Sequence, residues 1–435
     1  MGKSFSSLRK SLHLDGLLRD LGTYFSTIKD SRKSNSSYSL RDVLMTGYAI
    51  FSLKYPSLLN LESRTEITEE NLKKVYGLSN IISDSGLRKV LDNVSWRHLR
   101  RYFLGHFKQL KELGIVQNFR YLQAYNLVSI DGVKYFDSKK IHCPCCLEKT
   151  LSNQEVIYSH AMLCAAMVHP KAKDVFILGA EPIAKQDGQQ KNDCEQNALK
   201  RMMSWFSSHF KGEKLIFLQD ALFGTAPAIS TILENQWDFI ISAKPGSHAN
   251  LYKSFEQKLK IGQGLKKHLV EQEGKIYEFH WMNNQPLNGS HPHIRVNFLH
   301  CKETDKNGKV QIFSWITSLN ITTQNVMALM AAGRSRWKIE NETFNTLKNQ
   351  GYQFEHNYGH GYKHLSNVFA MLMLIAFTID QLVQHCSQSF QVLWKAAKTK
   401  IKLWENIRGI FFFKSFENFA QLYQELANAY RVKLE

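Results

Sequence analysis

The sequence predicts a mixed α/β fold with helical regions at both ends of the chain. Three observations support this fold class. Residues 1 to about 120 carry apolar residues at helical spacings of three and four. Short apolar runs typical of strands then alternate with helical patterns up to about residue 246. Helical spacing returns after about residue 321. A chain of 435 residues is too long for one ordinary core, so two or three domains are expected.

The chain is strongly basic along its whole length. It has 56 Lys and Arg residues against 38 Asp and Glu residues, a net charge of +18 and a pI near 9.4. A basic globular protein usually meets a polyanion, most often a nucleic acid, although a basic protein without such a partner stays an alternative. The hydrophobic content of 43% argues against disorder.

The sequence predicts a cytoplasmic protein without a membrane partner. The first residues, "MGKSFSSLRKSLHLDGLL", lack the long apolar run of a secretory signal. The most apolar run, 368–379, is too short to span a bilayer and is expected to form a buried core helix. Seven cysteines, an odd number in a long chain, suit a reducing compartment.

The N-terminal region, 1–120, is expected to be helical and to bind DNA. Three polar residues of "NIISDSG" are candidate N-caps of the next helix: Ser83, Asp84 and Ser85. That helical stretch is rich in basic side chains, namely Arg88, Lys89, Arg97, Arg100 and Arg101. We expect these side chains to contact DNA; the alternative is a solvated basic helix face.

The middle of the chain predicts three strands, then a helix, a strand, a helix and a strand. These elements are expected at 125–138, 158–170, 174–184, 193–210 (with an Asp N-cap), 214–220, 226–236 and 237–247. A mixed stretch follows, with strand-like segments at 275–283, 293–301 and 310–319. One helix is expected over 322–350, with further helices to the end.

Two aspartates occupy unusual places in these strands. Asp131 lies in the middle of an apolar strand, where a lone buried carboxylate is costly unless it is paired or binds a cation. Asp220 ends another apolar strand, and ligands of open α/β sheets bind at strand ends. A capping or turn role is the alternative for each residue, but two such acids on neighbouring strands favour a site.

A third acid, Glu340, lies among basic residues in "RSRWKIENETFNTLK", 334–348. Glu340 follows Arg336 by four residues, so both share one helix face, whereas Glu342 points elsewhere. Lys348 lies two turns further on roughly the same side. The three acids could hold divalent metal ions, which prefer oxygen ligands, for phosphoryl transfer. The alternative for Glu340 is a simple ion pair with Arg336.

The segments "SIDGVKYF", "LQDALFG" and "RWKIENETFNTLKN" resemble those of the IS4-type DDE transposases, which have an RNase H-like catalytic domain. The resemblance covers about 125–385. It implies an RNase H-like mixed sheet with a β-rich insertion. The expected regions are a helical DNA-binding domain (1–120), the catalytic domain in two parts (121–246 and 321–385), the insertion (247–320) and a C-terminal helical region (386–435).

The resemblance implies a site for two Mg²⁺ or Mn²⁺ ions at Asp131, Asp220 and Glu340. Arg336, Lys348 and Lys244 are the expected phosphate contacts. The family signature reads Tyr, two residues, Arg, three residues, Glu, six residues, Lys. Here Gly333 holds the tyrosine position, and the lysine is displaced by one place to Lys348.

The implied function is a transposase that binds insertion-sequence ends as a homodimer, cleaves the strand and joins it to target DNA. Its partners would be double-stranded DNA of the terminal inverted repeats and of the target, and its location the prokaryotic cytoplasm, at the nucleoid. Two alternatives stay open: an RNase H-like nuclease without strand transfer, and a domesticated DNA-binding repressor.

Four other features allow two interpretations each. The cluster of His142, Cys143, Cys145 and Cys146 could bind zinc, but a second pair of ligands is not obvious, so a hairpin is favoured. Lys191, Asp193 and Glu195 could lie near the metal site or simply begin a helix. The histidines His356, His360 and His364 suggest a loop against DNA rather than a metal site. Core packing is favoured over base stacking for Trp281 and Trp315.

Overall fold

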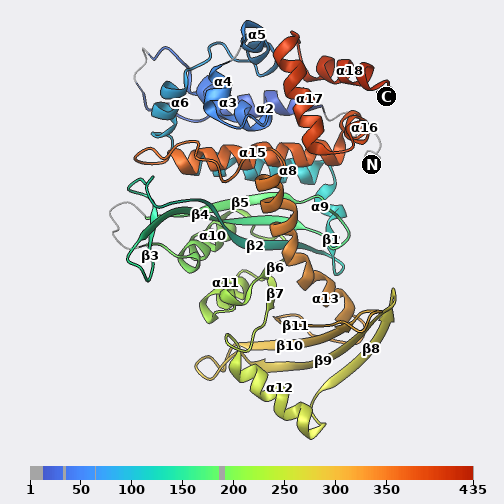
Figure 1. The fold of residues 1–435 in the computed structure, drawn as a ribbon. Helices are drawn as coiled ribbons and strands as arrows, with labels where there is room; N and C mark the ends of the chain where they lie inside the picture. Colours follow the sequence, from blue (N-terminus) through green and yellow to red (C-terminus); the bar gives the residue numbers. More distant parts are fainter. Residues whose placement is uncertain (1–12, 33–35, 64, 186–191, 435) are drawn as a thin grey trace.

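The computed structural model describes residues 13–32, 36–63, 65–185 and 192–434. It is an elongated molecule in which helices lie above one end of a long sheet, and a β-rich part lies at the other end (Figure 1). The N-terminal helices are α2 (Leu14–Ser26), α3 (Leu40–Ser52), α4 (Leu58–Glu62), α5 (Glu66–Val75), α6 (Asp84–Leu91), α7 (Trp96–Arg100), α8 (Tyr102–Glu112) and α9 (Ile115–Asn118). The oxygen of Ser83 caps α6, as the sequence predicted.

The strands of the central part follow the predicted order. They are β1 (Arg120–Tyr121), β2 (Tyr125–Ser138), β3 (Leu147–Thr150), β4 (Val156–Val168), β5 (Phe176–Ile183), β6 (Leu215–Gln219) and β7 (Asp238–Ser242). Helix α10 (Glu195–His209) precedes β6, and α11 (Ala226–Glu234) joins β6 to β7. Helix α10 begins two residues after the predicted Asp193 cap, because Asp193 pairs with Arg201 instead.

The sheet has a mixed topology that sets the places of the catalytic candidates. Strand β2 pairs with β4 and β4 with β5 in antiparallel register, whereas β2 pairs with β6 and β6 with β7 in parallel register. The parallel pairs need crossovers, which α10 and α11 supply. The predicted α/β fold class is therefore confirmed.

The insertion continues the same sheet. It contains α12 (Ala249–Ile261), β8 (Lys266–Gln272), β9 (Lys275–Pro286), β10 (Arg295–Thr304) and β11 (Val310–Thr317). Strand β11 pairs with β7, so one sheet runs from β3 to β8. Helix α12 and strand β8 were not predicted; both expose much of their surface, so the apolar pattern of each is weak.

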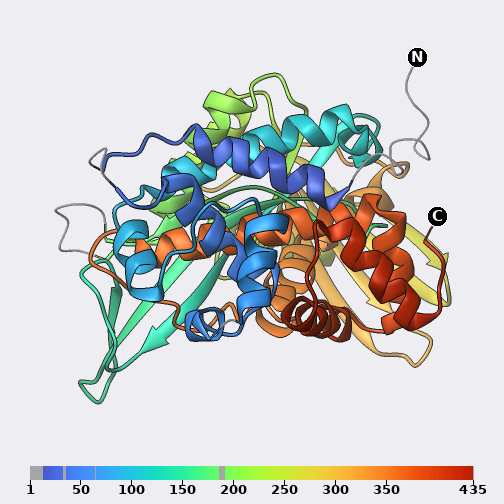
Figure 2. The same cartoon turned by 90° about the horizontal axis from the view of Figure 1, so that it is seen from above.

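Helix α15 (Leu365–Cys386) lies between the upper helices and the sheet (Figure 1) and contacts both α3 and β5. It is long and apolar enough to cross a membrane, but 94% of its most apolar window is buried inside the protein. The apolar run 368–379 is thus a core helix, as predicted. Seen from above, the C-terminal helices lie beside the N-terminal ones (Figure 2): α16 (Gln388–Ala397), α17 (Lys400–Phe413) and α18 (Phe419–Tyr430).

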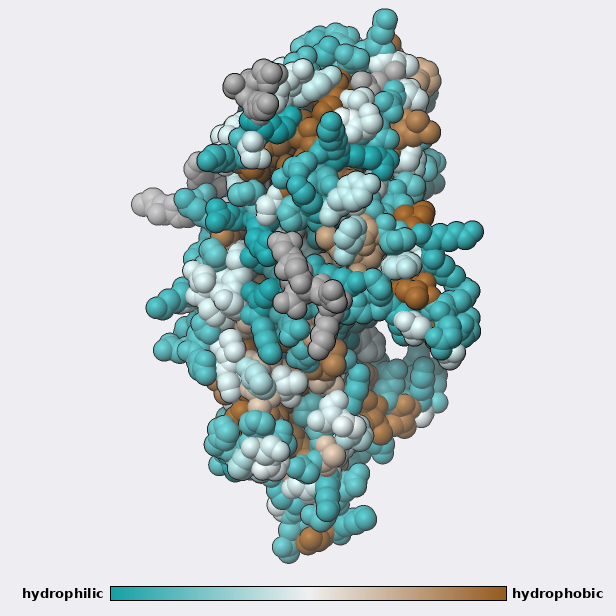
Figure 3. Space-filling view, turned by 90° about the vertical axis from the view of Figure 1, so that its left-hand side faces the viewer, coloured by the Kyte–Doolittle hydropathy of each residue, from teal (hydrophilic) through white to brown (hydrophobic). Residues whose placement is uncertain are grey.

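The face that lies on the left of Figure 1 is largely hydrophilic, and its apolar residues form small separate groups (Figure 3). The net charge of the whole chain is +18. A net positive charge of this size favours contact with a polyanion.

Candidate active site

Asp131 and Asp220 lie on neighbouring parallel strands. The register of β2 and β6 sets Ser129 opposite Leu218. Two further residues along both strands bring Asp131 level with Asp220, which follows the last residue of β6. Because paired strands lie about 4.8 Å apart, both carboxylates project near the same edge of the sheet.

Glu340 is brought to Asp131 by Arg336. One guanidinium nitrogen of Arg336, Nη1, lies 2.6 Å from Oδ2 of Asp131 and 2.8 Å from Oε1 of Glu340. The hydroxyl of Ser129 donates to the carbonyl oxygen of Arg336 at 2.9 Å, which holds this helical segment against β2. The ion pair expected as the alternative for Glu340 therefore exists, and the same arginine also reaches the strand acid.

The electrostatics of Asp131 favour a cation at this place. Burial and, after it, the neighbouring Glu340 carboxyl raise the pKa of Asp131 to about 7, against the opposing effect of Arg336. Two carboxylates this close repel each other unless a positive group stands between them. In this structure the Arg336 guanidinium occupies that position.

Asp220 has a separate partner. The Nζ atom of Lys244 lies 3.2 Å from Oδ2 of Asp220. Burial alone would raise the pKa of Asp220, but the backbone N–H of Ala221 and the Lys244 ammonium outweigh burial and hold the pKa below its usual value. Asp131 and Glu340 therefore share Arg336 as a partner, whereas Asp220 pairs with Lys244. Among the described residues, the carboxylate oxygens of the three acids do not all lie within metal-binding distance of one another.

A fourth carboxylate, Glu195 of α10, lies beside the same strand. A Cβ atom on Gly132 would collide with Oε1 of Glu195, so this side chain rests directly on the backbone next to Asp131. Burial, and then the charge of Asp220, raise the pKa of Glu195. Of the three polar residues considered near this place, Asp193 pairs with Arg201, and Lys191 lies outside the described residues. Only Glu195 reaches the acids.

These four carboxylates fit a hard divalent cation. Their donors are all oxygen atoms, which Mg²⁺ and Mn²⁺ prefer. The positive groups that contact Asp131, Glu340 and Asp220 are Arg336 and Lys244. Burial raises the pKa values of Asp131 and Glu195, and a cation bound beside them would favour their charged forms. Asp131, Asp220 and Glu340 are the residues that would hold the ions, with Glu195 next to them.

The helix that carries Glu340 changes its type at the site. The single helix expected over 322–350 is instead α13 (Val326–Arg334), a 3₁₀ turn η2 (Ser335–Trp337), a π turn η3 (Ile339–Phe344) and α14 (Asn345–Asn349). A π turn holds one more residue than an α turn and is frequent at functional sites. This π turn lies between Arg336 and Lys348, the lysine that is displaced by one place.

Lys348 does not contact the acids. Its Nζ atom lies 2.7 Å from Oε1 of Glu355, beyond the end of α14. Glu342 lies near Lys338 and Lys400, where its charge opposes the lowering of their pKa values by burial, so it points away from Glu340 as expected.

A cleft of about 250 Å³ opens beside Asp220. Its walls carry three basic side chains, Lys244, Arg334 and Arg336, and the half-exposed Trp337. Trp315 also borders it but is only 3% exposed, and Trp281 is 2% exposed, so both serve core packing as predicted. The Trp315 indole fills the space next to Gly333, where a Cβ atom would collide with it.

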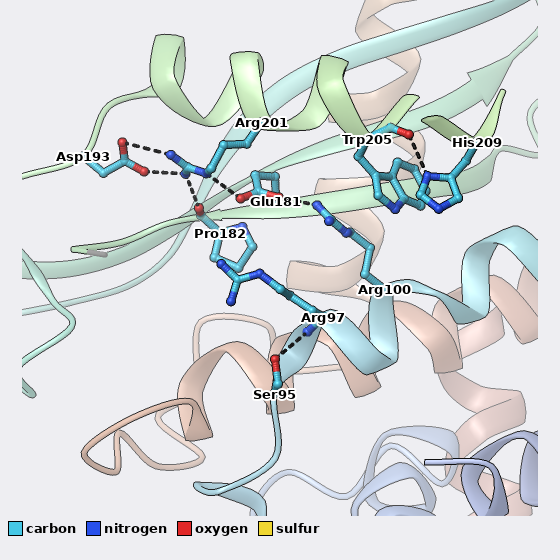
Figure 4. Close-up of polar contacts among 9 residues, drawn as sticks. All are labelled: Ser95, Arg97, Arg100, Glu181, Pro182, Asp193, Arg201, Trp205 and His209. Atoms are coloured by element: carbon cyan, nitrogen blue, oxygen red, sulfur yellow. Dashed lines mark hydrogen bonds and ion pairs between the residues drawn. The ribbon is translucent and has the colours of Figure 1, made fainter. Parts of the chain in front are cut away.

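Two of the basic residues expected to contact DNA in the N-terminal region, Arg100 and Arg88, have carboxylate partners within the protein. Arg100 of α7 and Arg201 of α10 both pair with the buried Glu181 of β5, and Arg201 also binds Asp193 (Figure 4). The expected DNA contact of Arg100 is therefore wrong, because this arginine joins the helical region to the sheet. Arg88 pairs with Asp84 within α6 at 2.6 Å.

Replacing Gly132 with alanine is expected to weaken metal-dependent activity while the fold is retained. The new methyl group would push aside Glu195, whose flexible side chain can move at little cost. Divalent-ion affinity, measured by titration calorimetry with Mn²⁺, should fall about tenfold, as for loss of a supporting carboxylate. Glu195→Gln should reduce Mn²⁺ affinity by a similar factor, and the double variant Gly132→Ala with Glu195→Gln should reduce it little further. Additive losses would show that Gly132 acts independently of Glu195.

Comparison with known proteins gives a family match over somewhat less than half of the chain. Residues 175–378 match the family described as the transposase DDE domain; this segment includes Asp220 and Glu340, and Asp131 precedes it. A cryo-EM structure of the piggyBac transposase synaptic complex with hairpin DNA is 9% identical, with a TM-score of 0.39, over 99% of this chain and 85% of that chain. No curated protein matches the chain. The family match, together with the acids it contains, supports a DDE transposase.

Proposed function

We propose that this protein is a DNA transposase of the IS4 type that binds the ends of an insertion sequence. It catalyses metal-dependent strand cleavage and then transfer of the freed end to target DNA. The observation that carries the proposal is that Asp131 lies level with Asp220 on the next parallel strand and is joined to Glu340 through Arg336.

Each residue has a proposed role in this reaction. Asp131, Asp220 and Glu340 hold two divalent ions, Mg²⁺ or Mn²⁺, which would activate the attacking hydroxyl and neutralise charge at the phosphate. Arg336 and Lys244 lie on the wall of the cleft beside Asp220, where they can orient a phosphate of the DNA strand. Lys348 would reach the backbone only after leaving Glu355.

The proposal includes the organisation expected from the sequence. The N-terminal region binds DNA (1–120), and two parts of the chain form the catalytic domain (121–246 and 321–385). The insertion lies between these parts (247–320), and the C-terminal region packs against the rest (386–435). Two copies bind two element ends in the cytoplasm. The broad positive charge of the chain supports contact with duplex DNA on both sides of the cleft.

The experiment uses the DNA that flanks the reading frame. Duplexes with the inverted repeats found there are incubated with the full-length protein, a supercoiled target plasmid and Mg²⁺. We expect nicking at the repeat boundary and joining of the freed 3′ end to the plasmid. Cleavage without joining would support the nuclease instead, and binding without cleavage in Mg²⁺ or Mn²⁺ would support the repressor.

A further inference from the structure

Two cysteines and two histidines from three separate segments converge away from the catalytic acids. The ligand atoms of Cys143, Cys146, His160 and His360 all lie within 4.8 Å of one another. The two sulfur atoms are 3.7 Å apart, and each lies 3.3 Å from Nε2 of His160. Nδ1 of His360 lies 3.7 Å from Sγ of Cys146.

These spacings match the edges of a tetrahedron around zinc. Zn–S bonds of about 2.3 Å and Zn–N bonds of about 2.0 Å at tetrahedral angles set two sulfurs about 3.8 Å apart and a sulfur about 3.5 Å from a nitrogen. The observed edges of 3.7, 3.3, 3.3 and 3.7 Å lie close to these values. The cluster therefore encloses a space of the right size for one zinc ion.

The surroundings hold the four side chains in place. Cys146 is fully buried, and His160 and Cys143 are 1% and 7% exposed. The backbone N–H of Cys143 donates to Sγ of Cys146 at 3.3 Å, which fixes the turn between the cysteines. The His360 ring meets the Phe136 ring edge to face, with centroids 4.1 Å apart. A mobile surface group would lack these restraints.

We propose that Cys143, Cys146, His160 and His360 bind one structural Zn²⁺ ion. Four protein ligands close the tetrahedron and leave no position for water or substrate, which is the pattern of a structural zinc site. Thiolate and imidazole ligands favour zinc, whereas the catalytic acids offer only oxygen ligands, which suit Mg²⁺ or Mn²⁺. The neighbouring Cys145 and His142 stay outside: Cys145 contacts the carbonyl oxygen of Lys363, and His142 stacks on Tyr158.

The ion would tie together parts of the chain that are distant in sequence. The cysteines lie between β2 and β3, His160 lies on β4, and His360 lies in the segment that leads from α14 into α15. His160 is paired with Phe136, which lies five residues, about 16 Å, along β2 from Asp131, so this cluster is separate from the catalytic acids. The zinc would hold the segment between α14 and α15, which follows the helical stretch with Glu340, against β2, the strand that carries Asp131.

The test is the metal content of the full-length protein, purified without chelator under reducing conditions. We expect one zinc per chain by mass spectrometry of the elements. X-ray absorption at the zinc edge should show two sulfur ligands at about 2.3 Å and two nitrogen ligands at about 2.0 Å. Both measurements use the unaltered protein, so they do not depend on whether a variant folds.

Variants then identify the ligands. His360→Ala, on the segment between helices, and Cys143→Ser should each lose the zinc, whereas Cys145→Ser and His142→Ala should keep it. Zinc well below one per chain in the unaltered protein would overturn the proposal. So would equal loss in the Cys145→Ser control, an all-oxygen ligand shell, or a Cys143–Cys146 disulfide found by peptide mass spectrometry.

Discussion

Asp131→Asn is expected to reduce strand cleavage by at least about a thousandfold, the scale of losing an essential catalytic group. Asp131 is the acid that faces both Glu340 and Arg336, and burial together with the Glu340 carboxyl raises its pKa against the effect of Arg336. Asparagine has nearly the same shape but supplies a single neutral oxygen, so the divalent ion loses a charged ligand. The measurement is single-turnover nicking of a terminal-repeat duplex in Mg²⁺.

Binding of that duplex should stay close to the unaltered level, because DNA affinity depends on Lys and Arg contacts rather than on this carboxylate. Two matched controls are available. Asp137→Asn lies on the same strand, where Asp137 pairs with Lys134 at the surface, and Glu342→Gln lies on the same π turn as Glu340. Both should nick DNA normally. Normal nicking by Asp131→Asn would refute the assignment of the site.

Lys54→Met is expected to lower the free energy of unfolding by about 3–5 kcal/mol, the usual effect of breaking a buried ion pair. The Lys54 side chain is fully buried, and its Nζ atom lies 2.6 Å from Oδ2 of Asp380 on α15. Removal of the lysine would leave that aspartate buried beside Tyr352, which donates to it. Burial already raises the pKa of Asp380 against the effect of Lys54, so the unpaired charge would be costly.

Urea unfolding followed by circular dichroism measures this effect. Adding Asp380→Asn to Lys54→Met should recover part of the loss, since the amide oxygen can still accept from Tyr352 without carrying a charge. Lys73→Met breaks an exposed ion pair with Glu69 and should change stability by less than about 0.5 kcal/mol. Equal effects of Lys54→Met and Lys73→Met would contradict the importance of burial.

Much of the catalytic core could be predicted because its sequence pattern is local. The strands around Asp131 and Asp220 are continuous apolar runs, and such runs indicate buried strands whatever their partners are. The i, i+4 relation of Arg336 and Glu340 likewise depends only on helical spacing. The structure adds that Arg336 reaches Asp131, a contact between residues 205 positions apart.

Other features depend on contacts that no local pattern contains. Cys143 and Cys146 are close in sequence, but His360 joins them across 214 positions, counted from Cys146. Glu195 resembles an ordinary first-turn acid until its position against Gly132 is known. The basic run on α7 looked like a DNA-binding face, yet Arg100 finds its partner on β5. Charge and periodicity in the sequence indicate which residues share a helix or strand face. The partner of each side chain depends on tertiary packing.

The pairing of β7 with β11 has a mechanical consequence. Trp315, Ile316 and Thr317 of β11 are in register with β7, the strand next to β6. An outward swing of the insertion would have to break this ladder and its hydrogen bonds. The residues of β7 and β11 that line the cleft beside Asp220 are therefore held next to each other by main-chain hydrogen bonds.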